Sequence, residues 1–167
     1  MKVKRLVYIA MLTAVALIVF MIEAQIPVPV PIPGVKLGLA NIITVYAMFT
    51  LGPASTLMIL LCRVFLGSMF SGQVITFFYS ISGGLLCYLS MLLMRKLVTQ
   101  KQIWVCSVIG AIFHNIGQII AAVLITRTPG IVVYLPMLLV TGIIAGVFTG
   151  ICAQFVVKRL PEPFKKD

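Results

Sequence analysis

The sequence predicts an all-α membrane protein, a bundle of six transmembrane helices in which residues 1–167 form a single integral membrane domain. Hydrophobic residues make up 62% of the chain, charged residues only 10%, and the mean hydropathy is +1.20. A soluble domain typically has charged side chains at about a quarter of its positions. This chain has too few charges to cover a water-exposed surface, and we therefore expect membrane lipid to surround it.

Six apolar runs, separated by short breaks, predict the individual spans when they are compared with a hydrocarbon core about 30 Å thick. The expected spans are Leu6–Ile22, Leu37–Leu51, Ala54–Phe70, Val74–Met94, Ile103–Thr126 and Val132–Val157. The second and third spans are short, and the Gly52-Pro53 pair between them permits only a tight turn. An alternative interpretation makes these two spans one long kinked helix.

The basic residues predict how the bundle is oriented. Of the 13 Lys and Arg residues, three precede the first span, three lie between the fourth and fifth spans, and four follow the sixth. These ten residues share one side of the membrane, which the positive-inside rule makes cytoplasmic. Both termini are therefore expected in the cytoplasm and the long loop between helices 1 and 2 outside. This topology accounts for the net charge of +10, so no nucleic-acid partner is expected.

The first span has two features of its own. It could be a signal peptide, but its apolar run is long for the hydrophobic region of one, and we expect a membrane helix. Ala10 and Ala14 are four residues apart and so place two small side chains on one face. Such a face lets another helix backbone approach closely, either within this chain or in a partner.

The loop from Gln25 to Asn41 cannot be a membrane helix. It contains four prolines within seven residues, at 27, 29, 31 and 33. Each proline fixes φ and removes a backbone donor, so an extended segment is expected. Asn41 follows this loop, near the expected outer end of the second span. There it either caps the helix or bonds a loop carbonyl, or it contacts a ligand.

Arg63 is the one basic residue inside a span. Placing an arginine near the bilayer midplane costs about 2.5–3.5 kcal/mol on insertion scales, so its side chain should face the protein interior or a wet cavity. Glu23, at the outer end of the first span, is the only carboxylate within plausible reach. The guanidinium is otherwise compensated by carbonyls or by an anionic or strongly polar ligand.

Polar side chains also recur in the fourth and fifth spans. In the fourth, Tyr79 accompanies Gln73, Thr76 and Ser80 in the outer half. In the fifth, His114 and Gln118 share a helical face with Gly110, and Asn115 lies beside it. These groups form either a satisfied network between helices or a polar binding site. A lone histidine without a second histidine or a membrane-embedded carboxylate predicts no metal site.

The depths of these side chains predict the kind of site. Polar groups concentrate in the outer half and at the midplane, whereas a channel needs polar lining through both leaflets. We therefore expect a cup open to the outside, with the proline-rich loop as its lid. The sequence has no nucleophile with a base, no paired carboxylates and no nucleotide-binding glycine loop, so we expect no catalytic residues, no cofactor and no enzyme activity. Gly142, Gly146 and Gly150 predict a ridge for helix packing in the sixth span.

Several of these motifs resemble a known family. The alanine pair of the first span, the long external loop and the progression KLGLANI, LGP and RxxLGSxxSG, which begin at Lys36, Leu51 and Arg63, are similar to substrate-binding (S) subunits of energy-coupling factor (ECF) transporters. More narrowly, the proline loop and the segment His114–Gln118 resemble the family called heptaprenyl diphosphate synthase component I, or the Gx transporter family.

The resemblance implies an S-component-like protein of the bacterial cytoplasmic membrane that captures a small molecule from outside. It implies that Ala10 and Ala14 contact a transmembrane coupling subunit, driven by two ATPase subunits. The substrate-binding residues expected on this basis are Asn41, Arg63, Tyr79, His114, Asn115 and Gln118. Two alternatives remain open: a non-catalytic accessory subunit in prenyl diphosphate or quinone metabolism or in quinone- and flavin-linked electron transfer, and a structural membrane partner without a ligand.

Overall fold

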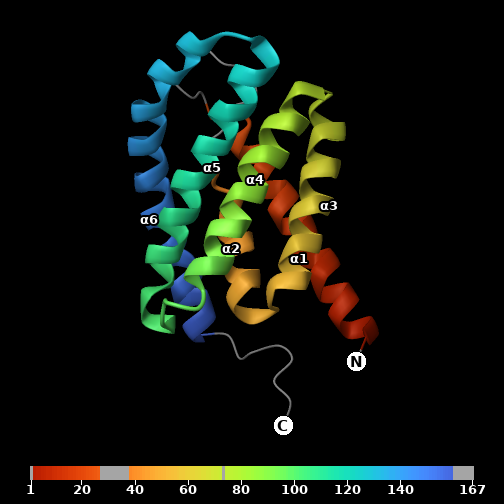
Figure 1. The fold of residues 1–167 in the computed structure, drawn as a ribbon. Coiled ribbons are helices and arrows are strands. Elements are labelled where there is room, and N and C mark those ends of the chain that lie inside the picture. Colours follow the sequence, from red (N-terminus) through yellow and green to blue (C-terminus); the bar gives the residue numbers. More distant parts are fainter. Residues whose placement is uncertain (1, 27–37, 73, 160–167) are drawn as a thin grey trace.

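The computed structural model describes residues 2–26, 38–72 and 74–159, and these residues form six α-helices and two short 3-10 helices (Figure 1). In chain order the elements are α1 (Lys2–Glu23), α2 (Asn41–Thr50), α3 (Pro53–Ser71), α4 (Val74–Met94), η1 (Gln100–Gln102), α5 (Ile103–Thr126), η2 (Pro129–Tyr134) and α6 (Leu135–Arg159). The predicted all-helical class is confirmed, and the predicted bounds of the fourth and fifth spans coincide with α4 and α5.

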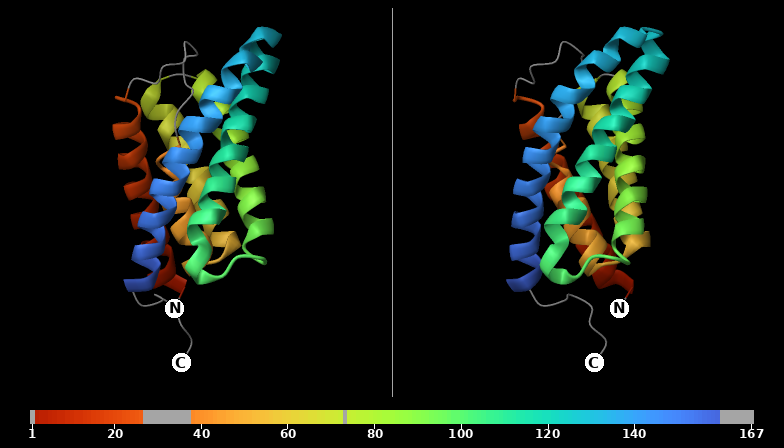
Figure 2. Two further views of the ribbon diagram at one scale, coloured as in Figure 1. Left: turned by 90° about the vertical axis from the view of Figure 1, so that its left-hand side faces the viewer. Right: turned by 60° about the vertical axis from the view of Figure 1, so that its left-hand side comes forward.

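Five of the described helices are long and apolar enough to cross a membrane. These are Val3–Glu23, Pro53–Ser71, Val74–Met94, Ile103–Thr126 and Pro129–Arg159. In the bundle α5 lies between α4 and α6, α3 lies between α1 and α4, and the shorter α2 packs against α6 and α3 (Figures 1 and 2). Lys2 begins α1 and Arg159 ends α6 at the same end of the bundle (Figure 2).

The second span differs from the prediction. Helix α2 has only 10 residues, which at 1.5 Å per residue gives about 15 Å, half of a hydrocarbon core. Gly38 precedes it with φ +84°, a left-handed conformation that ends any helical continuation toward the N-terminus. The expected crossing Leu37–Leu51 is therefore wrong as a full helical span. Asn41, the first residue of α2, is 5% exposed and therefore buried in the interior of the bundle.

The turn between α2 and α3 has the predicted form. Gly52 has φ +86°, and Pro53 is the first residue of α3, where its missing N–H is harmless. Arg5 of α1 reinforces this turn, because its guanidinium donates to the Leu51 carbonyl at 3.0 Å and to Ser55 Oγ at 2.8 Å. The alternative of one long kinked helix is excluded.

Glycines bring α5 close to both of its neighbours. A Cβ at Gly117 would lie 2.7 Å from the Ser82 carbonyl of α4, and one at Gly150 would lie 2.6 Å from Trp104 Cα of α5. A Cβ at Gly146 would lie 2.9 Å from Val108 Cα of α5, and one at Gly142 would collide with the Asn115 side chain of α5. The predicted glycine ridge of α6 is thus confirmed as a helix-packing surface.

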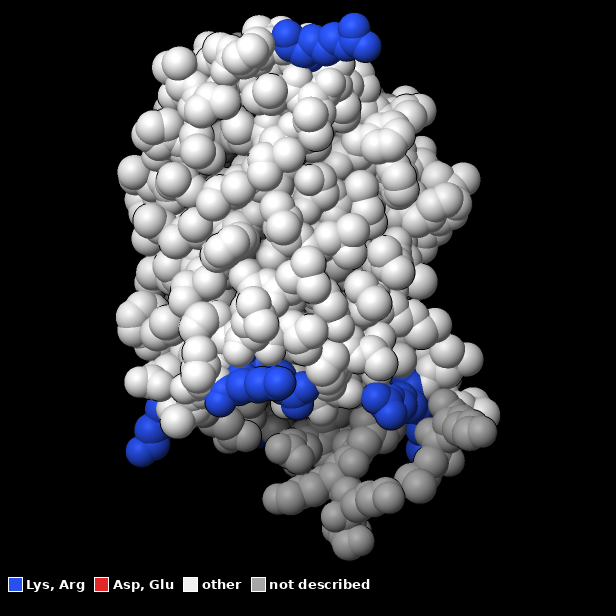
Figure 3. Space-filling model, in the orientation of Figure 1, with Lys and Arg blue, Asp and Glu red and all other residues white. Residues whose placement is uncertain are grey.

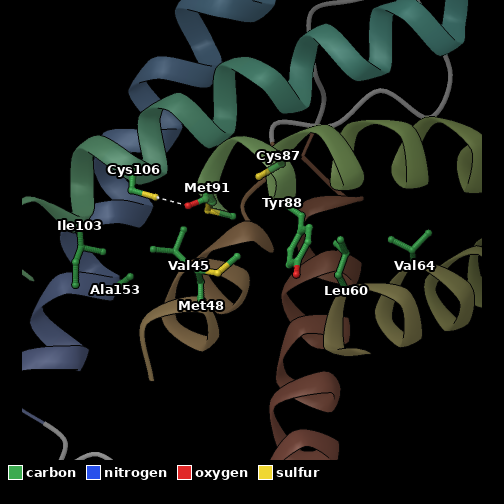
Figure 4. Packing of buried hydrophobic residues seen from close by; sticks show 10 residues of the cluster. All are labelled: Val45, Met48, Leu60, Val64, Cys87, Tyr88, Met91, Ile103, Cys106 and Ala153. Atoms are coloured by element: carbon green, nitrogen blue, oxygen red, sulfur yellow. Dashed lines mark hydrogen bonds between the residues drawn. The ribbon is translucent and has the colours of Figure 1, made fainter. Parts of the chain in front are cut away.

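An apolar core fills the half of the bundle nearest the termini (Figure 4). Its buried members come from five helices: Val45, Met48, Leu60, Val64, Cys87, Tyr88, Met91, Ile103, Cys106 and Ala153. All four cysteines are free thiols, and Cys87 and Cys106 pack in this core. This agrees with the predicted apolar role of these residues.

The exterior has the pattern of a membrane protein. Large apolar side chains such as Leu93, Leu124 and Phe155 are more than half exposed. Basic side chains gather at the end of the bundle that holds Lys2 and Arg159, a further basic side chain lies at the opposite end, and the broad surface between the two ends carries none on the face shown in Figure 3. The protein is a multi-pass membrane protein in which lipid replaces water around the bundle.

The close α5–α6 contact provides a first test of the fold. Gly150→Leu should destabilise the protein by about 1–3 kcal/mol, because the new side chain must displace the backbone at Trp104. The emission of the single tryptophan during thermal unfolding in detergent reports both stability and the local change. Gly130→Leu is the matched control, since nothing lies within 4 Å of a Cβ there. Equal melting of the two variants would contradict the packing described.

Candidate functional site

A small internal cavity lies where α1, α3, α4 and α5 converge above the apolar core. It measures about 10 Å³ and is lined by Phe20, Glu23, Gly38, Arg63, Ser80, His114 and Gln118. This volume corresponds to about one water molecule. The lining is nevertheless the most polar part of the described interior, with one carboxylate, one guanidinium, one imidazole and one amide.

Glu23 ties the cavity to the segment that leads into α2. One carboxylate oxygen accepts the backbone N–H of Gly38, and the other accepts that of Ala40 at 3.3 Å. Ala40 is fully buried and Glu23 is only 2% exposed. Non-helical backbone at membrane depth is tolerated only where the protein itself satisfies its polar groups. The Glu23 carboxylate satisfies two of these N–H groups.

Arg63 lines the same cavity from α3 and is 4% exposed. Its positive charge faces the negative charge of Glu23 across this small space, and opposite charges in a low-dielectric interior attract strongly. Its Nε atom has no hydrogen-bond partner among the described residues. The predicted inward orientation of this arginine is confirmed, and Glu23 is the carboxylate that compensates it.

His114 and Gln118 occupy successive turns of one face of α5, as predicted, and both line the cavity. A Cβ at Gly83 of α4 would lie 3.0 Å from His114 Cε1 and 3.0 Å from Gln118 Cγ, so a glycine at 83 lets α4 approach both side chains. Both side chains are at most 4% exposed. His114 Nδ1 and Gln118 Oε1 lack hydrogen-bond partners within the described part of the chain.

Asn41 reaches this cluster through Gly38. A Cβ at Gly38 would lie 2.8 Å from Asn41 Nδ2 and 3.3 Å from His114 Cδ2, so the glycine backbone is held between these two side chains. Neither amide atom of Asn41 has a partner among the residues described. The amide makes no capping bond to the helix it begins. Asn41 thus lies next to the cavity, at the point where residues 38–40 lead into α2.

Besides Asn41, two predicted site residues do not line the cavity. Asn115 lies on the neighbouring face of α5, where its amide nitrogen donates to the Leu138 carbonyl of α6. Tyr79 packs with Ile119, Ala122 and Leu138 in a second buried cluster, separate from the apolar core of Figure 4. One position along a helix rotates a side chain by about 100°, which separates Asn115 from His114. Both residues support α5 from outside the cavity.

Sequence reasoning had considered Glu23 only as a possible counter-charge and had left Phe20, Gly38 and Ser80 out of the expected ligand set. The signal for Glu23 was available, because it is the only acidic residue before the C-terminal tail. No sequence pattern distinguishes Gly38 from the other glycines. The proline-rich loop predicted to be a lid lies outside the described residues, and so does Gln73.

The predicted partner-contact residues have the opposite environment. Ala10 and Ala14 are both exposed, while Ile9, Thr13 and Ala16 make the buried face of α1. Their small side chains are therefore not used for packing within the described chain. The exposed face combines them with large apolar side chains such as Met11 and Ile18.

Comparison with known proteins agrees with this architecture. The model of the family described as heptaprenyl diphosphate synthase component I matches residues 12–156. The chain belongs to this family. No curated protein matches the sequence.

This family member also shares the fold of a solved structure, described as "Structure and mechanism of the S component of a bacterial ECF transporter". The TM-score is 0.66 at 23% sequence identity, with 95% of this chain and 93% of the other covered. The predicted S-component-like fold is thereby confirmed.

The family description names a synthase component, so the chemistry of the cavity must be considered. Glu23 is its one carboxylate, and it is engaged by two backbone amides. No group of three or more His, Cys, Asp or Glu side chains that could hold a metal ion occurs in the described ranges. What the cavity offers this family member is hydrogen-bond donors and acceptors around a buried arginine, an arrangement for holding a polar group.

The Glu23 contact can be tested by hydrogen exchange. Glu23→Ala should speed exchange of the Gly38 and Ala40 amides by about 10-fold or more, because each loses a charge-assisted hydrogen bond. Glu23→Gln keeps an acceptor oxygen and should give an intermediate rate. Gln25→Ala, a change at an exposed position two residues along, is the control. Unchanged protection of both amides in Glu23→Ala would contradict the contact.

Proposed function

We propose that this protein is the substrate-binding membrane subunit of an ECF-type uptake transporter in the bacterial cytoplasmic membrane. The observation that carries the proposal is a set of unpartnered polar atoms: those on Arg63, His114 and Gln118 line one cavity of the described interior, and those on Asn41 lie beside Gly38 in its wall. Buried polar groups are nearly always hydrogen-bonded, so a cluster of exceptions needs a functional explanation. A ligand that supplies the missing partners is that explanation.

The chemistry of the lining indicates how the ligand is held. Arg63 supplies a cationic donor for an anionic or strongly polar group, and His114 and Gln118 supply neutral donors and acceptors. Asn41 adds an amide from the opposite side. A vitamin-like molecule, or an isoprenoid or quinone precursor with a polar head, fits this set. Tyr79 and Asn115, also expected from sequence to touch the ligand, lie outside the lining of this cavity, where they pack against residues of α5 and α6.

Binding requires the site to enlarge. Pockets for small molecules typically have volumes of about 300–1,000 Å³, far above the 10 Å³ of this cavity. Residues 38–40 are the part whose displacement opens it most directly, because Gly38 lines the cavity and is backed by hydrogen bonds rather than by a helix. Glu23 then acts as a latch that holds this segment over the ligand.

Energy for uptake has to come from other subunits, since the sequence contains no nucleotide-binding glycine loop. The exposed pair Ala10 and Ala14 on α1 suits close contact with a helix of a transmembrane coupling subunit, which works with ATPase subunits. The fold shared with an ECF S component supports this assignment.

The family's description favours a second candidate, a non-catalytic accessory subunit in prenyl diphosphate or quinone metabolism or in quinone- and flavin-linked electron transfer. The two functions differ in their bound molecule. Native mass spectrometry of protein purified in a mild detergent distinguishes them: a vitamin-like molecule supports uptake, and a prenyl lipid or quinone supports the accessory role.

The site is tested by the double variant His114→Ala/Gln118→Ala. It should weaken retention of the co-purified molecule by about 10-fold or more, since two hydrogen-bonding side chains are worth about 1–3 kcal/mol together. Ser107→Ala is the control, because this buried hydroxyl bonds Thr149 on the α6 side of α5. Retention at the wild-type level by a correctly folded double variant would refute the site.

The partner surface is tested by Ala10→Trp/Ala14→Trp. The bulky side chains should abolish co-purification with a coupling subunit, because they prevent close helix approach, and should leave ligand retention unchanged. Val140→Trp places the same side chain at an exposed site on α6 and should keep the complex. Continued association of the double variant would argue against the transporter function.

A further inference from the structure

A second cavity, unrelated to the polar site, opens on the lipid-facing side of the bundle between α4 and α5. It measures about 280 Å³, and its walls include Leu89 and Leu93 of α4 and Ile109 and Phe113 of α5. We call this feature the α4–α5 groove. Its one polar side chain, Ser90, is already bonded to the Cys87 carbonyl at 2.8 Å. The groove therefore offers only apolar contact.

The groove faces lipid. Leu89 is 51% exposed and Leu93 is 70% exposed, and both belong to a helix that crosses the membrane. These residues occupy the last turns of α4, and Ile109 and Phe113 lie in the first three turns of α5. The groove thus lies in the half of the bundle that holds the termini. An extended hydrocarbon chain of a lipid in that leaflet fits such a surface.

Basic residues stand directly beyond the groove. Met94 lines its end, and Arg95 and Lys96 follow at once, with Lys101 before the start of α5. Lys96 and Lys101 are exposed. The only acidic residue in the described ranges is Glu23, which ends α1 at the opposite end of the bundle. The mouth of the groove therefore has positive charge with no neighbouring carboxylate among the described residues.

We propose that the α4–α5 groove is a binding site for an anionic phospholipid. One acyl chain lies in the groove, and the phosphate lies at the membrane surface among Arg95, Lys96 and Lys101. Basic clusters between helices on the cytoplasmic side are suited to anionic headgroups, and each Lys or Arg near such a surface adds about fivefold in affinity. The site is independent of the proposed uptake function.

The test uses the full chain in detergent, titrated with phosphatidylglycerol or with phosphatidylcholine carrying the same acyl chains. Native mass spectrometry should show phosphatidylglycerol binding at least about 10-fold more tightly. Arg95→Gln/Lys96→Gln/Lys101→Gln should remove most of this preference. Lys96→Gln alone should lower affinity about fivefold, whereas Lys4→Gln, on α1, which forms no wall of the groove, should change it little. Equal binding of the two lipids, or an unaffected triple variant, overturns the proposal.

The acyl chain is tested separately by Leu89→Trp, which fills the groove. It should lower phosphatidylglycerol affinity, whereas Leu124→Trp, at an exposed site near the other end of α5, should not. Unchanged binding by a folded Leu89→Trp variant overturns the groove as the binding site. Tighter binding of geranylgeranyl diphosphate than of phosphatidylglycerol also overturns the proposal and identifies an isoprenoid site instead.

Discussion

The hydrogen bonds from Gly38 and Ala40 to the Glu23 carboxylate are the contact on which the interior of this protein depends. A helix that starts half way through a membrane leaves unpaired amides at a depth where water cannot satisfy them. Without Glu23, residues 38–40 would have to become helical or leave the bundle. With it, α2 can remain ten residues long, and the space above α2 is available for polar side chains from the surrounding helices.

The same carboxylate determines the charge balance of the site. Arg63 and Glu23 are nearly completely buried and line one cavity, so each reduces the desolvation penalty of the other without requiring direct contact. The Nε–H group of Arg63 has no partner among the described residues, so the guanidinium keeps one donor available. A fully paired arginine would be a structural ion pair, whereas part of the hydrogen-bonding capacity of Arg63 is unused among the described residues.

Composition and charge were sufficient to predict the helical class, the bounds of α4 and α5, the glycine ridge and the inward Arg63. They could not predict that α2 is short, because residues 37–40 are as apolar as a membrane helix and hydropathy does not report backbone conformation. Periodicity placed His114 and Gln118 on one face, but it could not show that the Asn115 side chain forms a hydrogen bond with the Leu138 carbonyl of α6. The hydrogen bonds of Glu23 to Gly38 and Ala40 could not be predicted, because these residues are far apart along the chain and only the fold brings them together.

The position of the cavity constrains how a bound molecule could reach the other side of the membrane. Beneath it lies the apolar core of Figure 4, built from five helices. A hydrated path through this core would expose its large side chains to water at about 1.5–3 kcal/mol each, and it would separate helices that glycines hold in backbone contact. Movement of the intact bundle relative to the membrane avoids both penalties. Ala10 and Ala14 of α1 are exposed on the outside of the bundle, so a contact made there would leave this core undisturbed.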